Sequence, residues 1–271
     1  MNGTGARPLM LGLDLDGTLI APLLPMRPRV IEAVRATIER GVRVTLVTGR
    51  MFVGAVRYVR ELGITGPIVC YQGAVIADAE TGRFEFEQPL ANPTALRAYA
   101  AAKAHGYHVQ FYADDRFFVE TRNRYSDLYS RISGVEAIVV PSLPETFLGR
   151  GSTKVVLVTD AEQAAACQDV MREVCGPDAY ITRSNPEFVE LMDPGVDKGR
   201  ALGRIAAGYG IPMERVVAIG DSYNDFPLLR AAGFAVAMGS APTELKAEAD
   251  AVVGDVEHDG VAEAIERYVL T

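Results

Sequence analysis

Residues 9–19 read Leu-Met-Leu-Gly-Leu-Asp-Leu-Asp-Gly-Thr-Leu, an apolar run that ends in two aspartates and a glycine. The run 9–13 is typical of a buried strand, and Gly17 indicates that the chain turns just after Asp14 and Asp16. Open α/β sheets bind their ligands at the carboxyl ends of such strands. Two carboxylates forced together there are costly unless a cation lies between them or one takes a proton. The motif therefore favours a functional site over a solvated turn.

Strand-like and helix-like stretches alternate in the first and last thirds of the chain. In the first third, we expect strands at 9–13, 42–47 and 68–76 and helices at 28–40 and 51–62. The last third repeats this rhythm, with helices expected near 198–208, 226–232, 243–248 and 261–269 and strands at 216–219, 234–238 and 251–253. Such an order predicts a parallel sheet with right-handed crossovers.

The middle of the chain, from about residue 83 to 189, has strands that are richer in aromatic residues and alternate more clearly. Residues 181–184 and 188–192 are expected to pair antiparallel around the turn signal Asn185-Pro186. We therefore predict an α/β fold in which a Rossmann-like parallel-sheet core, residues 1–83 and 191–271, is interrupted by an inserted α+β domain, residues 84–190.

Composition and charge narrow the range of partners. The 271 residues carry 27 Lys and Arg against 35 Asp and Glu, a net charge of −8, which disfavours nucleic acid and anionic membranes as general partners. No apolar run approaches the roughly 20 residues of a membrane-spanning helix, and the first residues do not resemble a secretory signal. Cys70, Cys167 and Cys175 lack zinc-site or CxxC spacing and read as buried thiols in a reducing compartment. We expect a soluble cytoplasmic protein.

Two further motifs follow predicted strands. Thr48 and Gly49 come directly after the strand 42–47, where a hydroxyl and free backbone N–H groups suit a phosphate oxygen. Taken alone, however, an ordinary helix cap explains them better. After the strand 216–219, Asp221, Asn224 and Asp225 place acidic groups at a second strand end, with Asp221 positioned to meet the first acidic motif across the sheet. Carboxylate and carbonyl oxygens are the ligands that hard divalent cations such as Mg²⁺ prefer.

Other side chains have a plain interpretation beside the functional one. Lys198 begins a predicted helix, where a lone lysine is normally solvated. It gains a role only if the fold brings it beside those acids, where it would bind phosphate and balance charge. His105 and His108 have the H-x-x-H spacing of a metal pair but no third ligand in the segment, so a surface position is the better interpretation. A domain core, rather than a substrate platform, is favoured for the aromatic residues Tyr107, Phe111, Tyr112, Phe117 and Phe118.

The motifs D-x-D-G-T at 14–18, Thr48, Lys198 and G-D-x-x-N-D at 220–225, in this order, resemble the haloacid dehalogenase-like phosphatase superfamily. The long insertion between the Thr and Lys motifs resembles the group with a large α+β (C2) cap, often called Cof-type phosphatases. The resemblance spans nearly the whole chain. Its two acidic motifs are very specific together, whereas the Thr and Lys motifs are weak apart. It implies Mg²⁺-dependent hydrolysis of phosphoric monoesters, with the inserted domain as the cap that sets substrate specificity.

The same resemblance implies catalytic roles for the matching residues. Asp14 would be the nucleophile that forms an aspartyl-phosphate. Asp16 would protonate the leaving alcohol and later help to activate the water that hydrolyses the intermediate. The phosphoryl oxygens would be held by Thr48, Gly49 and Lys198.

A metal site is implied as well. Mg²⁺ would be bound by Asp221, one oxygen of Asp14 and the backbone carbonyl of Asp16. Asn224 and Asp225 would support this metal or the neighbouring lysine. The physical need is clear, because an anionic nucleophile must approach an anionic phosphate.

The expected substrate is a small phosphorylated metabolite such as a sugar phosphate, because a large cap can close over a small ester but fits a protein poorly. Arg183 and Asn185, on a predicted turn of the inserted domain, and Arg50, beside the Thr motif, are candidate substrate contacts. Two alternatives stay open: a phosphomutase of the same superfamily, and a catalytically inactive protein that binds a phosphorylated ligand. The sequence indicates neither the physiological ester nor an oligomeric state.

Overall fold

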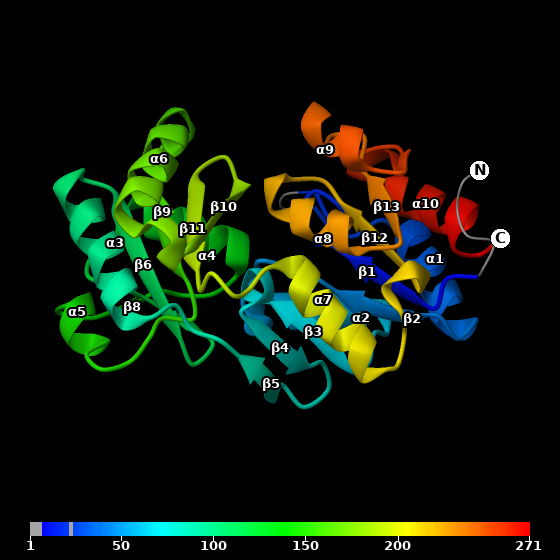
Figure 1. Ribbon diagram of the computed structural model, residues 1–271, viewed down its shortest axis with the longest axis horizontal. Helices are drawn as coiled ribbons and strands as arrows, with labels where there is room; N and C mark the ends of the chain where they lie inside the picture. Colours follow the sequence, from blue (N-terminus) through cyan, green and yellow to red (C-terminus); the bar gives the residue numbers. More distant parts are fainter. Residues whose placement is uncertain (1–6, 22–23) are drawn as a thin grey trace.

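The computed structural model describes residues 7–21 and 24–271 of the chain, and Figure 1 shows two lobes side by side. One lobe is built from the first and last thirds of the chain, and the other from the middle, drawn in green. Residues 1–6, on which the expected lack of a secretory signal partly rests, lie outside the described part. Within the described residues, no helix is both long and apolar enough to cross a membrane.

A parallel sheet forms the centre of the first lobe, with its strands in the order β14 (Ala251–Val252), β13 (Phe234–Ala237), β12 (Val216–Gly220), β1 (Met10–Leu13) and β2 (Arg43–Leu46). The covering helices are α1 (Pro28–Glu39), α2 (Phe52–Leu62), α7 (Lys198–Gly208), α8 (Phe226–Ala231), α9 (Thr243–Glu248) and α10 (Gly260–Tyr268). Neighbouring residues of a strand point to opposite faces. Leu11 and Leu13 therefore pack with residues of α1, α2 and α10, whereas Met10 packs with residues of α7, α8 and α9.

A small antiparallel sheet extends this lobe, formed by β3 (Pro67–Cys70), β4 (Val75–Asp78) and β5 (Phe84–Glu87). β3 lies beside β2 through a parallel bridge between Val47 and Val69. The expectation of one strand region at 68–76 is wrong, because the chain reverses in the short 3₁₀ helix η1 (Tyr71–Gly73), where all three residues have positive φ. The reversal places Gln72, whose side chain is fully buried, at the carboxyl end of β3.

The second lobe holds a sheet with the strand order β10 (Tyr180–Asn185), β11 (Phe188–Met192), β9 (Val155–Val158), β6 (His108–Ala113), β7 (Arg116–Val119) and β8 (Ile138–Val139). Neighbours are antiparallel except for β7 and β8. Residues of α3 (Asn92–Ala104), α5 (Leu143–Thr146) and α6 (Ala164–Cys175) pack on one face, and those of α4 (Arg124–Ser133) on the other. This lobe also contains the 3₁₀ helices η2 (Ala161–Gln163) and η3 (Gly176–Asp178). Three further 3₁₀ helices belong to the first lobe: η4 (Met213–Arg215), η5 (Tyr223–Asp225) and η6 (Val256–His258). The expected fold class, a parallel-sheet α/β core with an additional antiparallel sheet, is confirmed.

The aromatic residues of the middle section divide between the two faces of this second sheet. Phe111 and Phe118 pack edge-on against Phe147, with ring centroids 5.1 and 5.5 Å apart. On the other face, Tyr112 and Phe117 pack against Tyr129 of α4. These side chains therefore form a core, as expected, although the second cluster also lies close to the cavity described below.

The histidines and cysteines occupy different surroundings. His105 is exposed, but the surface interpretation is wrong for His108, because β6 carries it into a half-buried position where its Nδ1 lies 3.1 Å from Asn123 Nδ2. Burial lowers the pKa of His108 to about 4. The three cysteines are free and buried, as the sequence predicts.

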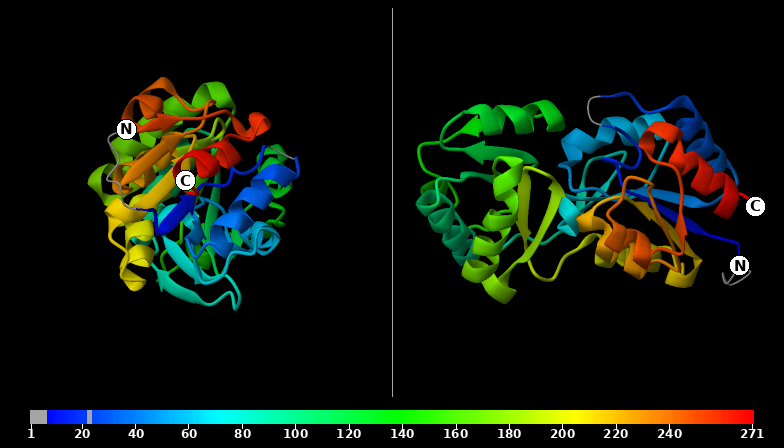
Figure 2. Two further views of the ribbon diagram at one scale, coloured as in Figure 1. Left: turned by 90° about the vertical axis from the view of Figure 1, so that its right-hand side faces the viewer. Right: turned by 90° about the horizontal axis from the view of Figure 1, so that it is seen from above.

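The chain crosses between the lobes after β5 and after β11, and Figure 2 shows the two lobes side by side. The two crossing segments touch there, since Gln88 Nε2 donates to Asp193 Oδ1 at 2.6 Å. The predicted division at residues 83/84 and 190/191 stays a prediction. The strand pairing favours crossings a few residues later, because β5 pairs with β4 and β11 pairs with β9 and β10.

The turn between β6 and β7 also holds the second lobe against the first. Asp115 in this turn accepts the backbone N–H groups of Phe52 and Val53, at 2.9 and 2.7 Å, and so caps the start of α2. Tyr71 Oη donates to the same carboxylate at 2.8 Å. The cavity between the lobes is therefore bordered by direct contacts on more than one side.

Candidate active site

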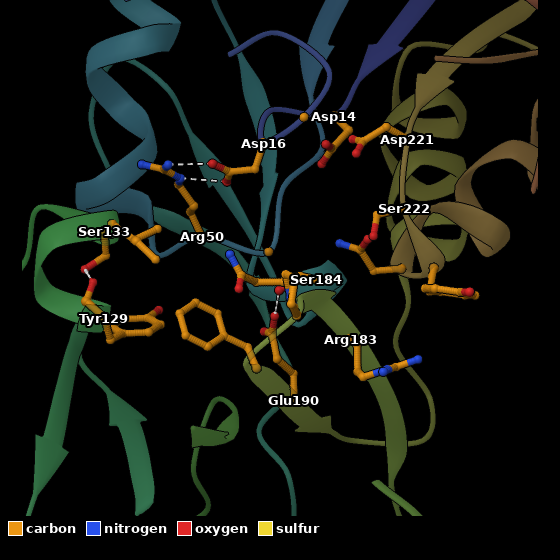
Figure 3. A pocket seen from close by; sticks show the side chains of 18 of the residues that line it. Asp14, Asp16, Arg50, Tyr129, Ser133, Arg183, Ser184, Glu190, Asp221 and Ser222 are labelled. Atoms are coloured by element: carbon orange, nitrogen blue, oxygen red, sulfur yellow. Dashed lines mark hydrogen bonds and ion pairs between the residues drawn. The ribbon is translucent and has the colours of Figure 1, made fainter. Parts of the chain in front are cut away.

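The carboxyl ends of the parallel strands meet at one rim of the first sheet, where the predicted motifs lie. Asp14 follows β1, Thr48 follows β2, Asp221 follows β12, and Lys198 begins α7. The strand order makes β12, β1 and β2 neighbours, and Figure 3 shows Asp14 and Asp221 with their carboxylates side by side. The fold thus brings side chains from distant parts of the sequence to one place.

Three carboxylates form the base of this rim. Oxygen atoms of Asp14, Asp221 and Asp225 lie within 4.8 Å of one another. Burial, reinforced by the charge of Asp225, raises the pKa of Asp14 despite the opposing effect of Lys198. Burial and Asp225 also raise the pKa of Asp221 to about 7. So much negative charge in a buried place calls for a cation, and an all-carboxylate set fits a hard divalent ion.

The turn that follows Asp14 and Asp16 packs directly against Asp221. Thr18 Oγ1 donates to Asp221 Oδ1 at 2.8 Å. Gly17 has a φ of 87°, and a Cβ atom on it would lie 2.2 Å from Asp221 Oδ2. Only glycine therefore fits this turn, both for its backbone conformation and for the room it leaves to the aspartate.

Lys198 is buried against the acids. Its Nζ donates to Asp14 Oδ1 at 2.5 Å and to Asp225 Oδ1 at 2.6 Å, and 1% of its side chain is exposed. Burial acts to lower the pKa of Lys198, but the two carboxylates more than offset it and raise the pKa. The solvated interpretation is wrong, because α7 begins beneath the rim and turns its first side chain inward. Asp225 also accepts the backbone N–H groups of Asp221 and Ser222, which holds the motif loop in place.

The Asp16 side chain faces Arg50. Its carboxylate oxygens accept from Arg50 Nη2 at 2.6 Å and from Nε at 2.7 Å (Figure 3). The Arg50 side chain is only 10% exposed. Its third nitrogen, Nη1, is buried without a hydrogen-bond partner among the described residues. Arg50 is thus not a surface pair, and its expected contact with the substrate stays a prediction. The contribution expected from the backbone carbonyl of Asp16 stays a prediction.

Gly49 lines the cavity, and Thr48 is buried next to it. Thr48 Oγ1 accepts the backbone N–H of Arg50 at 3.1 Å, which leaves its own O–H to donate. Its backbone N–H donates to the carbonyl of Val69 and is therefore occupied. A Cβ atom on Gly49 would lie 2.2 Å from Gln72 Nε2, so the close approach of this amide requires glycine.

A cavity of about 560 Å³ lies between the acidic rim and the second lobe. The predicted turn of the second lobe borders it, since Arg183 and Asn185 line it together with Asp14 and Asp221. The Arg183 guanidinium lies 5.4 Å from the ring centroid of Tyr223, across the gap between the lobes. A further wall is apolar and consists of Tyr129, Ile132 and Phe188.

A buried polar network that the motifs did not reveal joins the lobes beside this cavity. Glu190 of β11 accepts from Lys154 Nζ at 2.8 Å and from Gln72 Nε2 at 3.1 Å. Lys154 also donates to the carbonyl of Gly49 at 2.9 Å, and Asn224 Nδ2 donates to Gln72 Oε1 at 3.1 Å. Lys154 and Glu190 are each only 2% exposed. One sequence signal was available for Glu190: a charged residue inside the apolar run of a strand.

Comparisons with known proteins agree with this geometry. The sequence profile of a family described as haloacid dehalogenase-like hydrolase matches residues 11–265. The chain is 28% identical to the pyridoxal phosphate phosphatase YbhA of Escherichia coli, over 96% of this chain and 98% of that protein. It is 26% identical to the 5-amino-6-(5-phospho-D-ribitylamino)uracil phosphatase YitU of Bacillus subtilis, over 97% and 98%. The crystal structure of a haloacid dehalogenase-like hydrolase from Bacteroides thetaiotaomicron superposes with a TM-score of 0.84 at 29% identity, over 96% and 99%.

Proposed function

Because the chain belongs to the family of haloacid dehalogenase-like hydrolases, we propose that it hydrolyses small phosphomonoesters with Mg²⁺ through an aspartyl-phosphate on Asp14. Its enzyme class, a phosphoric monoester hydrolase, is the class of its named relatives. The family resemblance that the motifs predicted is confirmed by the match over residues 11–265.

One observation carries the proposal. Asp14, Asp221 and Lys198 come from three separate stretches of the chain and meet at one end of a cavity that is large enough for a small metabolite. A nucleophilic carboxylate, a second carboxylate for a cation and a fixed positive charge are the parts that phosphoryl transfer through a covalent intermediate needs.

The proposed reaction has two displacements at phosphorus. A carboxylate oxygen of Asp14 attacks phosphorus, and the bond from phosphorus to the leaving oxygen breaks as Asp16 gives that oxygen a proton. Water then attacks phosphorus, Asp16 takes up a proton of this water, and the bond to Asp14 breaks to release inorganic phosphate. Thr48, Gly49 and Lys198 hold the other phosphoryl oxygens in both steps.

Charge is the main obstacle to the first step. Two unit negative charges 4 Å apart repel by ~4 kcal/mol at an effective dielectric of about 20. Lys198, bonded to Asp14, offsets part of this repulsion. Mg²⁺ held by Asp14, Asp221 and the backbone carbonyl of Asp16 would neutralise further charge on the phosphoryl group. Asn224 and Asp225 support this arrangement from behind.

The proposed substrates are small phosphorylated metabolites. The phosphatases named among the relatives carry two such compounds in their names, pyridoxal phosphate and 5-amino-6-(5-phospho-D-ribitylamino)uracil. Arg183 and Asn185 border the cavity from the second lobe, and Arg50 Nη1 is a buried donor at its edge. We assign these three side chains to the leaving group. The three free, buried cysteines support a reducing compartment such as the cytoplasm.

A phosphate-release screen over about a hundred phosphorylated metabolites with added Mg²⁺ tests the proposal. We expect release from at least one small ester, loss of activity with EDTA, and loss of activity in Asp14→Asn. Asp169→Asn is the matched control, because Asp169 is exposed on α6 and lies outside the cavity lining.

The outcomes separate the alternatives. Full activity in Asp14→Asn eliminates the proposed nucleophile. Formation of a phosphate isomer without phosphate release identifies a phosphomutase. Tight binding of a phosphorylated compound without turnover of any ester in the panel identifies a binding protein.

A further inference from the structure

A line of buried amide and carboxylate groups runs from the second lobe to the acidic rim, and it bears on the metal site of the proposed function. Gln72 stands in its middle, with Nε2 donating to Glu190 Oε1 and Oε1 accepting from Asn224 Nδ2, both at 3.1 Å. The exposed fractions of Asn224, Glu190 and Gln72 are 5%, 2% and 0%. Asn224 lines the cavity together with Asp14.

The hydrogen-bond donors and acceptors of these side chains fix how each amide group in the line is oriented. An ionised carboxylate only accepts hydrogen bonds, so Glu190 requires the NH₂ group of Gln72 on its side. The carbonyl oxygen of Gln72 must then face Asn224 and requires the NH₂ group of that residue. The Nδ2 group of Asn224 is therefore used by Gln72, and Oδ1 is the atom of this amide that the line leaves without a partner. This Oδ1 is buried and has no hydrogen-bond partner among residues 7–21 and 24–271.

Glu190 is surrounded by hydrogen-bond donors of its own lobe. Lys154 Nζ donates to Glu190 Oε2 at 2.8 Å, and the hydroxyl of Ser184 donates to Oε1. Burial acts to lower the pKa of Lys154, but Glu190 more than offsets it, and the pKa is raised. The positive charge beside Glu190 thus persists at neutral pH and keeps Glu190 an acceptor.

The backbone conformation of Gln72 holds its side chain between Glu190 and Asn224. Gln72 has a φ of 59°, in the left-handed region, and its backbone N–H donates to the carbonyl of Thr48 at 3.1 Å. Such a conformation costs of order 1 kcal/mol or more for a residue other than glycine, and it persists where the surroundings fix it. Gly49 leaves the room that the Gln72 amide occupies.

We propose that Glu190 and Gln72 are positioning residues that fix the amide of Asn224, so that its Oδ1 accepts a hydrogen bond from a water bound to the active-site cation. Mg²⁺ keeps several of its waters in proteins, and each of these waters turns its oxygen toward the cation and its hydrogens outward, so it is mainly a hydrogen-bond donor. An NH₂ group in the same place would face the cation and its waters with the wrong polarity. The metal site is therefore complete only when the second lobe places Glu190 against Gln72.

Metal binding, measured without substrate, tests this inference. Outer residues that orient the groups around a metal typically contribute 10–100-fold to affinity, so Glu190→Gln is expected to weaken Mg²⁺ binding about tenfold by calorimetry. Lys154 requires the oxygen of the substituted amide, so its NH₂ group faces Gln72 and the direction of the line is reversed. Glu120→Gln is the matched control: Glu120 lies in the same lobe and forms an ion pair with Lys103, but it contacts neither Gln72 nor Asn224. Its Mg²⁺ affinity should stay within about twofold of the parent protein.

A double-mutant cycle separates orientation from general loosening of the lobes. In an Asn224→Ala background the amide is absent, so Glu190→Gln should change Mg²⁺ affinity by less than about twofold. An equal tenfold loss in both backgrounds overturns the inference, and so does an unchanged affinity in Glu190→Gln. If Glu190→Gln fails to fold, Gln72→Met in the same two backgrounds serves the same cycle.

A further variant tells failure of this inference from failure of the proposed function. Asp221→Asn should abolish Mg²⁺ binding if the acidic rim holds the cation. If Asp221→Asn leaves Mg²⁺ binding unchanged, the proposed metal site is wrong and the inference fails with it. If Asp221→Asn abolishes Mg²⁺ binding but the effects of Glu190→Gln and Asn224→Ala on affinity are additive, the metal site stands and only the orienting role of Glu190 and Gln72 is rejected.

Discussion

Two lysines lie almost completely buried in this protein, one in each lobe, and they differ in the charge around them. Lys198 is 1% exposed and binds two carboxylates, those of Asp14 and Asp225. Lys154 is 2% exposed and binds one carboxylate, Glu190, together with the carbonyl of Gly49. In both cases the pKa of the lysine is raised although burial acts to lower it.

The difference shows which buried charges point to chemistry. The pair of Lys154 and Glu190 is balanced and requires nothing more. Around Lys198, the acids Asp14, Asp221 and Asp225 outnumber the lysine, and the surplus negative charge is relieved only by a further cation or by a bound proton. Surplus charge marks the candidate metal site, whereas the balanced pair marks the contact between the lobes.

Replacement of each lysine by methionine is expected to have the largest effect on activity, and it tests whether the two lysines have different roles. Removal of a fixed donor at a reacting oxygen typically costs 10²–10³-fold in rate, so Lys198→Met should reduce phosphate release by at least about that factor. Lys154→Met should reduce it by about tenfold or less, because Lys154 acts through Glu190. Initial rates on the best ester of the screen provide the measurement. Equal losses in the two variants contradict the division of roles.

Stability should respond alike at the two lysines. Removing one partner of a buried ion pair costs about 3–5 kcal/mol of unfolding free energy, so Lys154→Met and Lys198→Met should both be destabilised by about that much in urea titrations. Replacing both Lys154 and Glu190 by methionine should recover most of the loss, because no unpaired charge remains. A double variant as unstable as Lys154→Met shows that the pair contributes more than charge balance.

The surplus charge around Lys198 also predicts a dependence on pH. The pKa of Asp221 is raised to about 7 in the protein without a cation, whereas its ordinary value is 3.8. The folded protein therefore holds this proton more tightly than the unfolded chain. The stability that Asp221 contributes is full below about pH 4 and is lost as the pH rises through about 7.

Mg²⁺ should reverse this loss, because it binds the deprotonated carboxylate. Below pH 7 its affinity should fall by up to about tenfold per pH unit. The rise in melting temperature on addition of Mg²⁺ should therefore be larger at pH 8 than at pH 5.5. An equal rise at both values contradicts the assignment of Asp221 as a ligand.

Substitution of Arg50 is expected to have the smallest effect. Arg50 is a third buried cation, but its partner Asp16 is partly exposed. Its guanidinium binds both oxygens of Asp16, a geometry that a lysine cannot reproduce. Arg50→Lys should lower kcat/KM by roughly fivefold, equivalent to ~1 kcal/mol. A loss as large as that of Lys198→Met places Arg50 among the groups that stabilise charge at phosphorus.

The sequence predicted those parts of the site that lie in short, contiguous motifs. Asp14 and Asp221 stand directly after apolar strands, and parallel strands place such ends at one rim by geometry alone. Lys198 was found only through the family resemblance, because nothing in its own segment shows that the helix start is buried.

The contacts between the lobes escaped prediction for a physical reason. Gln72 and Glu190 are 118 residues apart, and the pairing of their side chains depends on how the two lobes sit against each other. The turn that carries Gln72 was predicted as part of one strand because apolar residues flank it on both sides; Gly73 was the available turn signal, but it does not show that Tyr71 and Gln72 also adopt positive φ. Glu190, alone among apolar neighbours in its strand, carried the same signal that identified Asp14.

The hydrogen bond between Gln88 and Asp193 fixes where the middle of the chain leaves the parallel-sheet lobe and where it returns. Exit and entry lie within the reach of two side chains, so a short linker spans the gap. The ends of the intervening segment therefore meet, and a segment of this kind can be added to or exchanged in a host fold without reordering its strands. A different lobe can in this way be attached at the same place while the acidic rim of the parallel sheet stays intact.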